Sequence, residues 1–312
     1  MARIVVTRTL PGTAVDRLAE HHVVDVWSRD EPPSAGELRA LVANADGLLS
    51  MLSDAVDEQL IAAAPNLRAI ANYAVGSDNI DLAAAAARGI PVGVTPDVLT
   101  DATADLAMTL VLAVARHLPE AAASVRNGGW RTWSPHGWLG LELARAELLV
   151  IGAGRIGRAV GHRAEAFGMT VVYAGRDDNV AALLPSADVV SLHAPLTQQT
   201  RRMIDATALA AMKPGAILIN TGRGGLVDQD ALRRALHEGH LGGAGLDVTD
   251  PEPLPPDDPL LGAPNLIVLP HIGSATHAAR IAMAQIAADN LTAALAGEPM
   301  PNPAPTRARA DG

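Results

Sequence analysis

A chain of 312 residues, 49% hydrophobic and 19% charged, is long enough to bury two ordinary cores. Its net charge of −10 argues against nucleic acid or an anionic membrane as the main partner. The absence of cysteine excludes disulfides, thiolate nucleophiles and thiolate metal sites. No signal peptide or membrane-spanning stretch is evident, so we expect a cytoplasmic protein.

The first hundred residues alternate short apolar runs with alanine-rich helical patterns. The predicted strands are 4–7, 23–27, 47–51, 68–73 and 91–94, and the helical stretches between them lie near 12–21, 35–44, 54–64 and 81–88. This alternation is typical of a parallel, doubly wound α/β sheet. The next stretch, 101–117, is apolar on most of its surface, which predicts a helix buried in a core or at a subunit interface.

A second α/β unit begins at residue 148 with an apolar strand, 148–151, that runs into G-x-G-x-x-G, a helical pattern and a further strand. In this motif Gly152 allows a tight turn, Gly154 lets a pyrophosphate approach the backbone, and Gly157 lets helix and strand pack closely. The start of the helix presents N–H groups and a partial positive charge to phosphates. Because glycines also collect in ordinary turns, the flanking strands and helix carry this prediction of a dinucleotide site.

The rest of the chain continues the second unit and then leaves it. Further strands are predicted at 188–194, 216–221, 243–248 and 266–269, with helical patterns near 205–212 and 228–238. The amphipathic segment 275–296 is expected to return to the first domain, and the proline-rich tail from 297 to be loose. We therefore predict two doubly wound parallel-sheet domains. A substrate-binding domain comprises 1–97 and 282–312, and a Rossmann dinucleotide-binding domain comprises 98–281.

Three polar residues follow predicted strands of the second unit: Arg223, Glu252 and His271. Ligands of open α/β sheets bind beyond the carboxyl ends of the strands, so all three are expected to face one crevice. Each alone has a plainer interpretation, as a surface arginine, a solvated carboxylate or a structural histidine. Together, a guanidinium can hold a carboxylate, and a carboxylate beside an imidazole favours its protonated, proton-donating form. No spacing of His, Asp and Glu suggests a metal site.

Several motifs resemble those of the D-isomer-specific 2-hydroxyacid dehydrogenases. They are NYAVGSDNID at 72–81, TPDVLTDATAD at 95–105 and PHIGSAT at 270–276. Within that family, GLDVT at 245–249, PEPLP at 251–255 and GEPMP at 297–301 look most like the glyoxylate/hydroxypyruvate reductases. The resemblance covers about residues 3 to 301.

The resemblance implies NAD(P)H-dependent reduction of small 2-oxo acids such as glyoxylate and hydroxypyruvate. Arg223 would bind the substrate carboxylate and carbonyl, His271 would donate the proton, Glu252 would tune His271, and Asp247 would lie near the nicotinamide. The implied substrate-binding residues are Val75 and Gly76, through their backbone N–H groups, with Arg223, Ser274 and Trp138. The expected cofactor-binding residues are Thr103, Gly152, Gly154, Arg155, Ile156, Gly157, Gly175, Arg176, Ala194, Pro195, Thr221, Gly222, Asp247, His271 and Gly273.

Two departures from the family pattern stand out. The usual glycine-containing turn before the first nucleotide-domain strand is replaced by ARAE at 144–147. Only the segment 177–187 joins the second strand to the third, where the family normally fits a further helix and strand. We therefore expect the adenine side of the cleft to be more open than usual and cofactor affinity to be weaker.

The end of the second strand predicts a preference for NADPH, with NADH as the other possibility. In NAD-binding units an acidic residue commonly accepts hydrogen bonds from the ribose at this position. Here Gly175 leaves room and Arg176 supplies a cation for the 2′-phosphate. Asp177 and Asp178, which follow directly, oppose this interpretation unless they face solvent.

Three tryptophans, Trp130, Trp133 and Trp138, lie close together in a chain with 2% aromatic residues. A packed interdomain or dimer contact is the plainer interpretation, and the resemblance adds that Trp138 reaches the partner's active site. Together with the apolar stretch 101–117, the cluster predicts a homodimer. Two alternative functions stay open at this point: oxidation of 3-phosphoglycerate, and a nucleotide-sensing homologue that has lost turnover.

Overall fold

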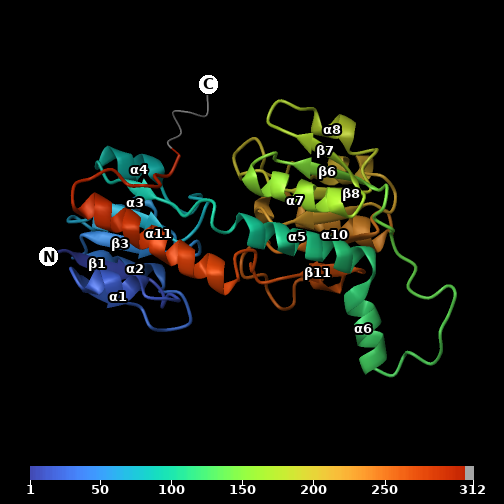
Figure 1. Cartoon of the computed structure of the whole chain (residues 1–312), viewed down its shortest axis with the longest axis horizontal. Coiled ribbons are helices and arrows are strands. Elements are labelled where there is room, and N and C mark those ends of the chain that lie inside the picture. The colour runs from blue at the N-terminus through green and yellow to red at the C-terminus, as the bar shows by residue number, and fades with distance from the viewer. Residues whose placement is uncertain (306–312) are drawn as a thin grey trace. The chain divides into compact units, whose positions relative to one another are not determined.

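The computed structural model describes residues 1–305 and divides into two compact units (Figure 1). The first comprises Met1–Leu99 and the segment from Ala275 onward, and the second comprises Thr100–Ser274. The chain thus passes between the units at 99/100 and 274/275, against predicted boundaries at 97/98 and 281/282. Each unit is built on one wholly parallel sheet with helices on both faces, so the predicted fold class is confirmed.

The first unit has a five-stranded sheet in the order β2-β1-β3-β4-β5. In chain order its elements are β1 (Arg3–Val6), α1 (Ala14–Ala19), β2 (Val23–Val26), α2 (Ala35–Val42), β3 (Gly47–Ser50), α3 (Glu58–Ala63), β4 (Ala69–Asn72), α4 (Leu82–Ala87), β5 (Val92–Gly93) and α11 (His277–Leu295). β3 and β4 are buried along their whole length, as expected of apolar runs covered on both faces. Every predicted strand of this unit is therefore present.

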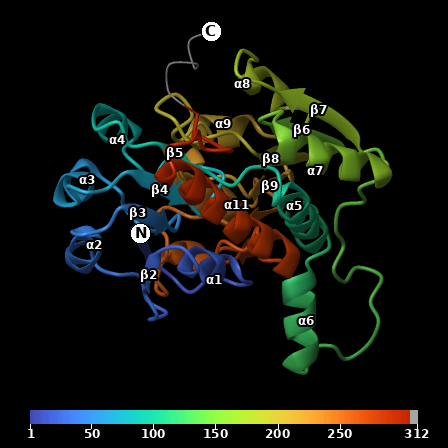
Figure 2. The same ribbon diagram turned by 60° about the vertical axis from the view of Figure 1, so that its left-hand side comes forward.

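Helices cover both faces of this sheet (Figures 1 and 2). α2, α3 and α4 pack on one face, where Leu38, Ile61 and Ala85 meet strand residues such as Leu48 and Ile70 in one core. α1 and α11 pack against each other, and α11 also contacts β3, β4 and β5. The final helix therefore covers one face of the sheet that the first hundred residues form, although its apolar residues are not confined to one side.

The predicted looseness of the tail is wrong for its described part. The N–H of Val94 donates to the carbonyl of Asn302 at 2.9 Å, and the N–H of Ala304 donates to the carbonyl of Val92 at 2.7 Å. The fully buried Asn290 of α11 accepts the N–H of Asn302 at 2.9 Å. The tail lies beside the short edge strand β5, whose unpaired backbone groups it satisfies. Residues 306–312 lie outside the described part of the chain.

The second unit has a six-stranded sheet in the order β11-β10-β9-β8-β6-β7. Its elements are α5 (Thr100–Ala115), α6 (Leu118–Arg126), β6 (Glu147–Ile151), α7 (Arg155–Ala166), β7 (Thr170–Ala174), α8 (Val180–Leu183), β8 (Val189–Leu192), α9 (Ala206–Ala211), β9 (Ile217–Asn220), α10 (Gln229–His237), β10 (Gly243–Leu246) and β11 (Leu266–Val268), with 3-10 turns at Gly224–Leu226 and Pro259–Gly262. The strand order reverses between β6 and β8. In open α/β sheets such a switch point is where ligands bind.

The apolar stretch 101–117 forms α5, which covers one face of this sheet together with α7. Residues of α5 such as Leu110 and Val111 are almost completely buried, and the helix packs against β9 and β10. Arg163 of α7 joins the two helices by ion pairs with Asp101 at 2.9 Å and Asp105 at 2.6 Å. Burial in the core of its own unit, one of the two predicted alternatives, accounts for the composition of α5.

The two departures from the family pattern, at 144–147 and 177–187, are both visible in the second unit. At 144–147 the turn is made without glycine, because Arg145 itself adopts the left-handed region with φ of 70° and donates its N–H to the carbonyl of Gly168 at 2.7 Å. Between β7 and β8 the chain has only the four-residue helix α8, so β7 is the edge strand of the sheet.

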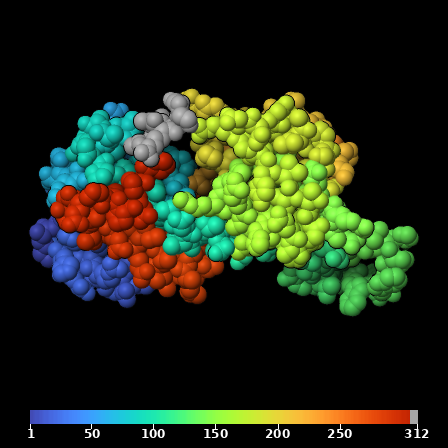
Figure 3. All heavy atoms as spheres, turned by 45° about the horizontal axis from the view of Figure 1, so that its top comes forward, coloured from blue at the N-terminus to red at the C-terminus, as the bar shows by residue number. Residues whose placement is uncertain are grey.

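Helix α6 and the loop that follows it were not predicted, and they project from the second unit (Figures 1 and 3). α6 has no buried residue, and the loop exposes Trp130, Trp133, Trp138 and Leu139 to between 50% and 79%. Over residues 1–305, no single helix is long and apolar enough to cross a membrane; α5 and α6 reach that length only as a pair bent by 61°.

Candidate active site

Three loops at the carboxyl ends of β6, β8 and β9 meet at the switch point of the second sheet. Gly152 has φ of 99°, and a Cβ there would lie 2.6 Å from the carbonyl carbon of His193 and from the N–H nitrogen of Ala194. A Cβ on Gly222 would lie 3.3 Å from the carbonyl of Leu192 and 3.5 Å from that of Ala194. The predicted cofactor-binding residues of these loops are thus neighbours, and Gly152 needs to be glycine for this closeness.

The glycine motif shapes the start of α7. Gly154 is the N-cap, and Arg155 and Ile156 begin the helix, whose first N–H groups have no partner within it. A Cβ on Gly154 would meet nothing within 4 Å, whereas one on Gly157 would lie 2.1 Å from the carbonyl oxygen of Gly152. The structure therefore leaves open space where a pyrophosphate would approach the backbone and keeps helix and strand in close contact. These residues fit a dinucleotide.

His193 lies among these loops and was given no role from the sequence. Its Nε2 is 2.8 Å from the hydroxyl of Ser191, and its Nδ1 is 3.4 Å from the hydroxyl of Thr221. Burial lowers the pKa of His193 to about 4, so the imidazole is neutral at neutral pH. The sequence feature that could have drawn attention to His193 was Ser191, a polar residue within an otherwise apolar, completely buried strand.

The loop that carries Arg223 is held by its own strand and by a neighbouring loop. The buried Asn220 donates to the carbonyl of Arg223 at 2.8 Å and accepts the N–H of Gly222 at 3.0 Å. A Cβ on Gly224 would lie 2.0 Å from the carbonyl carbon of Thr249, so the loops after β9 and β10 touch through their backbones. Gln229 strengthens this contact, since its carboxamide bonds both the N–H and the carbonyl of Asp250, at 2.7 and 3.0 Å.

The structure brings Glu252 and His271 together. Glu252 Oε2 lies 2.9 Å from His271 Nδ1, and the two side chains are 33% and 24% exposed. The other carboxylate oxygen, Oε1, accepts the N–H of Thr249 at 3.0 Å, which fixes the orientation of the carboxylate. A carboxylate on Nδ1 leaves Nε2 as the ring nitrogen that can donate to a ligand.

Asp247 organises the turn that carries His271. Its two carboxylate oxygens accept the N–H groups of Ile272 and Gly273, both at 2.7 Å, and its carbonyl accepts the N–H of His271 at 2.9 Å. His271 is held with φ of 54°, an uncommon conformation for a non-glycine residue. Burial raises the pKa of Asp247, and the two N–H donors oppose that shift. Thr103 of α5 closes the cluster by donating to the carbonyl of Gly273 at 3.2 Å.

The predicted phosphate-binding residues Gly175 and Arg176 lie exposed directly after the edge strand β7. A Cβ on Gly175 would meet only the carboxylate of Asp178, at 3.5 Å. That carboxylate turns back and accepts the N–H of Gly175 at 2.7 Å. The acidic side chain that opposed the NADPH interpretation therefore lies at the strand end itself.

The remaining predicted site residues belong to other segments of the chain. Val75 and Gly76 belong to the first unit and follow β4, where Val75 is 37% exposed. Trp138 lies in the exposed loop after α6, with φ of 56°. Ser274 is the last residue of the second unit. In residues 1–305, no three histidine, aspartate or glutamate side chains group as a metal site.

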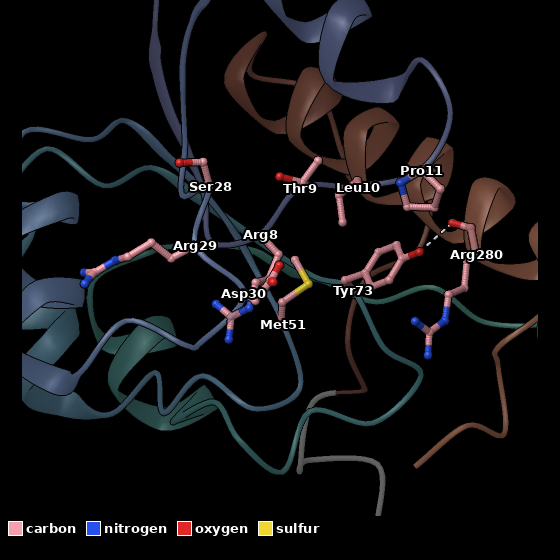
Figure 4. A pocket seen from close by; sticks show the side chains of 10 residues that line it. All are labelled: Arg8, Thr9, Leu10, Pro11, Ser28, Arg29, Asp30, Met51, Tyr73 and Arg280. Atoms are coloured by element: carbon pink, nitrogen blue, oxygen red, sulfur yellow. Dashed lines mark hydrogen bonds between the residues drawn. The ribbon is translucent and has the colours of Figure 1, made fainter. Parts of the chain in front are cut away.

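The first unit has a cavity of about 220 Å³ at the carboxyl ends of β1 to β4 (Figure 4). Met51 and Tyr73 line it from the loops after β3 and β4, and the hydroxyl of Tyr73 donates to the carbonyl of Arg280 at 2.6 Å. The guanidinium groups of Arg29 and Arg280 point away from one another, so they do not form one anion site.

Comparisons with known proteins identify the family to which the chain is similar. The model of the family described as "D-isomer specific 2-hydroxyacid dehydrogenase, NAD binding domain" matches residues 108–273. A glyoxylate reductase of Korarchaeum cryptofilum is 45% identical, over 96% of this chain and 95% of its own.

Two solved structures are similar over nearly the whole chain. The TT0316 protein of Thermus thermophilus is 51% identical, with a TM-score of 0.92, over 96% of this chain and 99% of its own. An NADPH-dependent glyoxylate/hydroxypyruvate reductase of Sinorhizobium meliloti, solved with NADP and malonate, is 35% identical, with a TM-score of 0.83, over 97% and 96%.

We predict that two alanine substitutions in the glycine motif both weaken nucleotide binding but differ in their effect on stability. Gly157→Ala places a Cβ against the Gly152 carbonyl, so it should cost about 1–3 kcal/mol of stability and weaken nucleotide binding. Gly154→Ala should leave the melting temperature unchanged but raise the Kd for NADPH, because its Cβ fills the space of the pyrophosphate. Thermal unfolding and fluorescence titration measure both. A normal Kd in Gly154→Ala would contradict this placement of the phosphates.

The lowered pKa of His193 predicts a loss of stability in mild acid. Between pH 6.5 and 4 the unfolded imidazole binds a proton that the folded one does not, so the free energy of unfolding should fall as pH drops. His193→Asn, which cannot titrate, should flatten this dependence by about 3 kcal/mol at most. His162→Asn, at a histidine 87% exposed on α7, serves as the control. Equal urea-denaturation profiles of both variants across this range would show that His193 titrates normally.

Proposed function

Because this chain belongs to the D-isomer-specific 2-hydroxyacid dehydrogenase family, we propose that it reduces glyoxylate and hydroxypyruvate with a reduced nicotinamide nucleotide. The observation that carries the proposal is the pair of His271 and Glu252, 2.9 Å apart, at the carboxyl edge of the dinucleotide-binding sheet. Two relatives named for glyoxylate or hydroxypyruvate reduction, matched over nearly the whole chain, support the choice of substrate. The presence of this pair also argues against the alternative that the protein is a nucleotide-sensing homologue without catalytic turnover.

In this proposal each polar residue has one task. Arg223, on its held loop, binds the carboxylate of the 2-oxo acid in a planar, two-point contact and also contacts the carbonyl oxygen. The N–H groups of Val75 and Gly76 bind the same carboxylate. The bound nicotinamide supplies a hydride for the carbonyl carbon. Protonated His271 donates from Nε2 to the oxygen that becomes negative, while Glu252 stabilises the imidazolium through Nδ1.

We predict that His271→Ala removes the proton donor and little else. The turnover number for glyoxylate should fall by roughly 10²–10⁴, while the Kd for NADPH stays close to that of the wild type. The assay follows NADPH absorbance, and wild-type protein must consume NADPH when glyoxylate is added. His162→Asn is again the control, since it lies on the exposed face of α7. Full turnover in His271→Ala would exclude this residue as the donor.

We further propose that NADPH is preferred over NADH. Arg176 is the first side chain after Gly175 with a charge suited to a 2′-phosphate, and the exposed end of β7 leaves room for it. The Sinorhizobium meliloti relative is described as NADPH-dependent. A charge-assisted contact of about 1.5–3 kcal/mol corresponds to a preference of roughly ten- to hundredfold.

Two substitutions at the end of β7 should therefore change cofactor use in opposite directions. Arg176→Ala should raise the KM for NADPH and leave that for NADH nearly unchanged. Asp178→Asn keeps an acceptor for the N–H of Gly175 but removes a negative charge, so it should lower the KM for NADPH. Initial rates with both cofactors measure this. Higher kcat/KM with NADH in the wild type would reject the proposed role of Arg176.

We also propose that the protein is a homodimer whose contact includes the loop after α6. Trp130, Trp133 and Leu139 are exposed to at least 68% in the single chain, a hazard for aggregation unless a partner covers them. Light scattering at micromolar concentration should give twice the 32.2 kDa mass of the chain. Trp133→Ser combined with Leu139→Ser should shift the mass toward the monomer. A monomeric wild type would refute the dimer.

A further inference from the structure

Two asparagines link the loops at the carboxyl edge of the first sheet. Asn72, the last residue of β4, is fully buried, and its Nδ2 donates to the carbonyl of Gly76 at 2.8 Å and to Oδ1 of Asn79 at 2.9 Å. Its own Oδ1 accepts the hydroxyl of Ser50, the last residue of β3, at 3.1 Å. The loop after β4 is thereby bonded to the end of β3.

Asn79 extends the link to the loop after β3. Its Nδ2 donates to the carbonyls of Met51 at 3.0 Å and Asp54 at 2.9 Å. The carboxylate of Asp54 in turn accepts the N–H of Met51 at 2.7 Å and the hydroxyl of Thr7, which follows β1. Loops after β1, β3 and β4 are therefore connected by directional bonds, which set their relative position more narrowly than apolar packing does.

The loop held in this way has two unused donors. Within residues 1–305, the backbone N–H groups of Val75 and Gly76 make no hydrogen bond, although the Gly76 carbonyl is bonded to Asn72. Val75 is 37% exposed, so the loop is open to a ligand. Consecutive free backbone N–H groups in a turn form a concavity that binds anions.

We propose that Asn72 and Asn79 are positioning residues that hold the Val75–Gly76 loop in the shape that receives the carboxylate of a 2-oxo acid. This role rests on the proposed function. Asn72 acts on the loop directly through the Gly76 carbonyl, and Asn79 anchors Asn72 to the neighbouring loop. Neither touches the substrate, so their loss should alter substrate binding and leave nucleotide binding intact.

The test replaces each carboxamide by an isosteric carboxylate. In Asn72→Asp and Asn79→Asp the donors to Gly76, Met51 and Asp54 are lost, and the KM for glyoxylate should rise roughly tenfold or more, because small displacements of a binding loop are costly. The Kd for NADPH, from fluorescence titration, should change less than about twofold, since the nucleotide unit contains neither residue.

The matched control is Asn290→Asp. Asn290 is also a fully buried asparagine of the first unit, and it joins the carbonyl of Val94 to the N–H of Asn302, at 3.0 and 2.9 Å. Its substitution should lower the melting temperature in the same way but leave the KM for glyoxylate unchanged. The comparison therefore separates the positioning of the loop from a general loss of stability.

Each outcome decides the inference. Glyoxylate turnover in the wild type with an unchanged KM in Asn72→Asp and Asn79→Asp would overturn the positioning role alone. A wild type without turnover would reject the proposed function and this role with it. If an aspartate variant does not fold, Asn72→Ser and Asn79→Ser, which add no buried charge, carry the same expected rise in KM. Hydrogen exchange of residues 73–80 should be faster in them than in Asn290→Ser, and equal exchange would refute the role.

Discussion

The arrangement of the candidate site depends on the hydrogen bonds that the buried carboxylate of Asp247 accepts. It accepts two consecutive N–H groups, from Ile272 and Gly273, and so compensates for the uncommon left-handed conformation of His271. Without the carboxylate, the buried N–H of Gly273 would be left unpaired at a cost of about 1–3 kcal/mol, and the part-buried N–H of Ile272 would lose its partner as well. The direction of the imidazole relative to Glu252 follows from this turn.

Around that turn the site is built from close backbone contacts. Gly152 packs against the loop at His193 and Ala194, and Gly224 packs against Thr249. At each contact a side chain would overlap with a backbone atom, which relaxes less readily than a side chain does. Carboxamide side chains then fix the positions of these closely packed loops. Asn220 donates to the carbonyl of Arg223, and Gln229 accepts the N–H of Asp250, two residues before Glu252. The reacting groups therefore lie on short loops whose positions the sheet dictates.

The first unit uses the same construction. The last residues of β3 and β4, Ser50 and Asn72, are polar and fully buried; Ser50 donates to Asn72, and Asn72 donates to the loop that follows β4. In the second unit Asn220 ends β9 in the same way. A polar residue that ends an apolar strand is costly to bury, and in both units it is compensated by bonds to the loop that follows. In both sheets, a buried asparagine at the end of a strand therefore fixes the position of the loop that follows it.

Much of this protein was determined by the sequence alone, because the signals are local. The period of apolar residues identified the strands and α5, the spacing of Gly152, Gly154 and Gly157 identified the start of α7, and strand ends followed by Arg223, Glu252 and His271 identified the candidate site. Parallel strands end at one edge, so residues far apart in the sequence were expected to lie together without any knowledge of their contacts. The family motifs indicated the expected reaction and the roles of these residues.

The tertiary structure decided what depends on contacts between distant segments. The tail from 297 was predicted to be loose because proline and polar residues carry no period, yet it pairs with β5, whose edge offers unpaired backbone groups. The left-handed turn at Arg145 needed no glycine, since a bond to Gly168 holds it. His193, Asn72 and Asn79 were given no role of their own from the sequence, although both asparagines lie in the motif at 72–81, because several of their hydrogen-bond partners are more than 20 residues away.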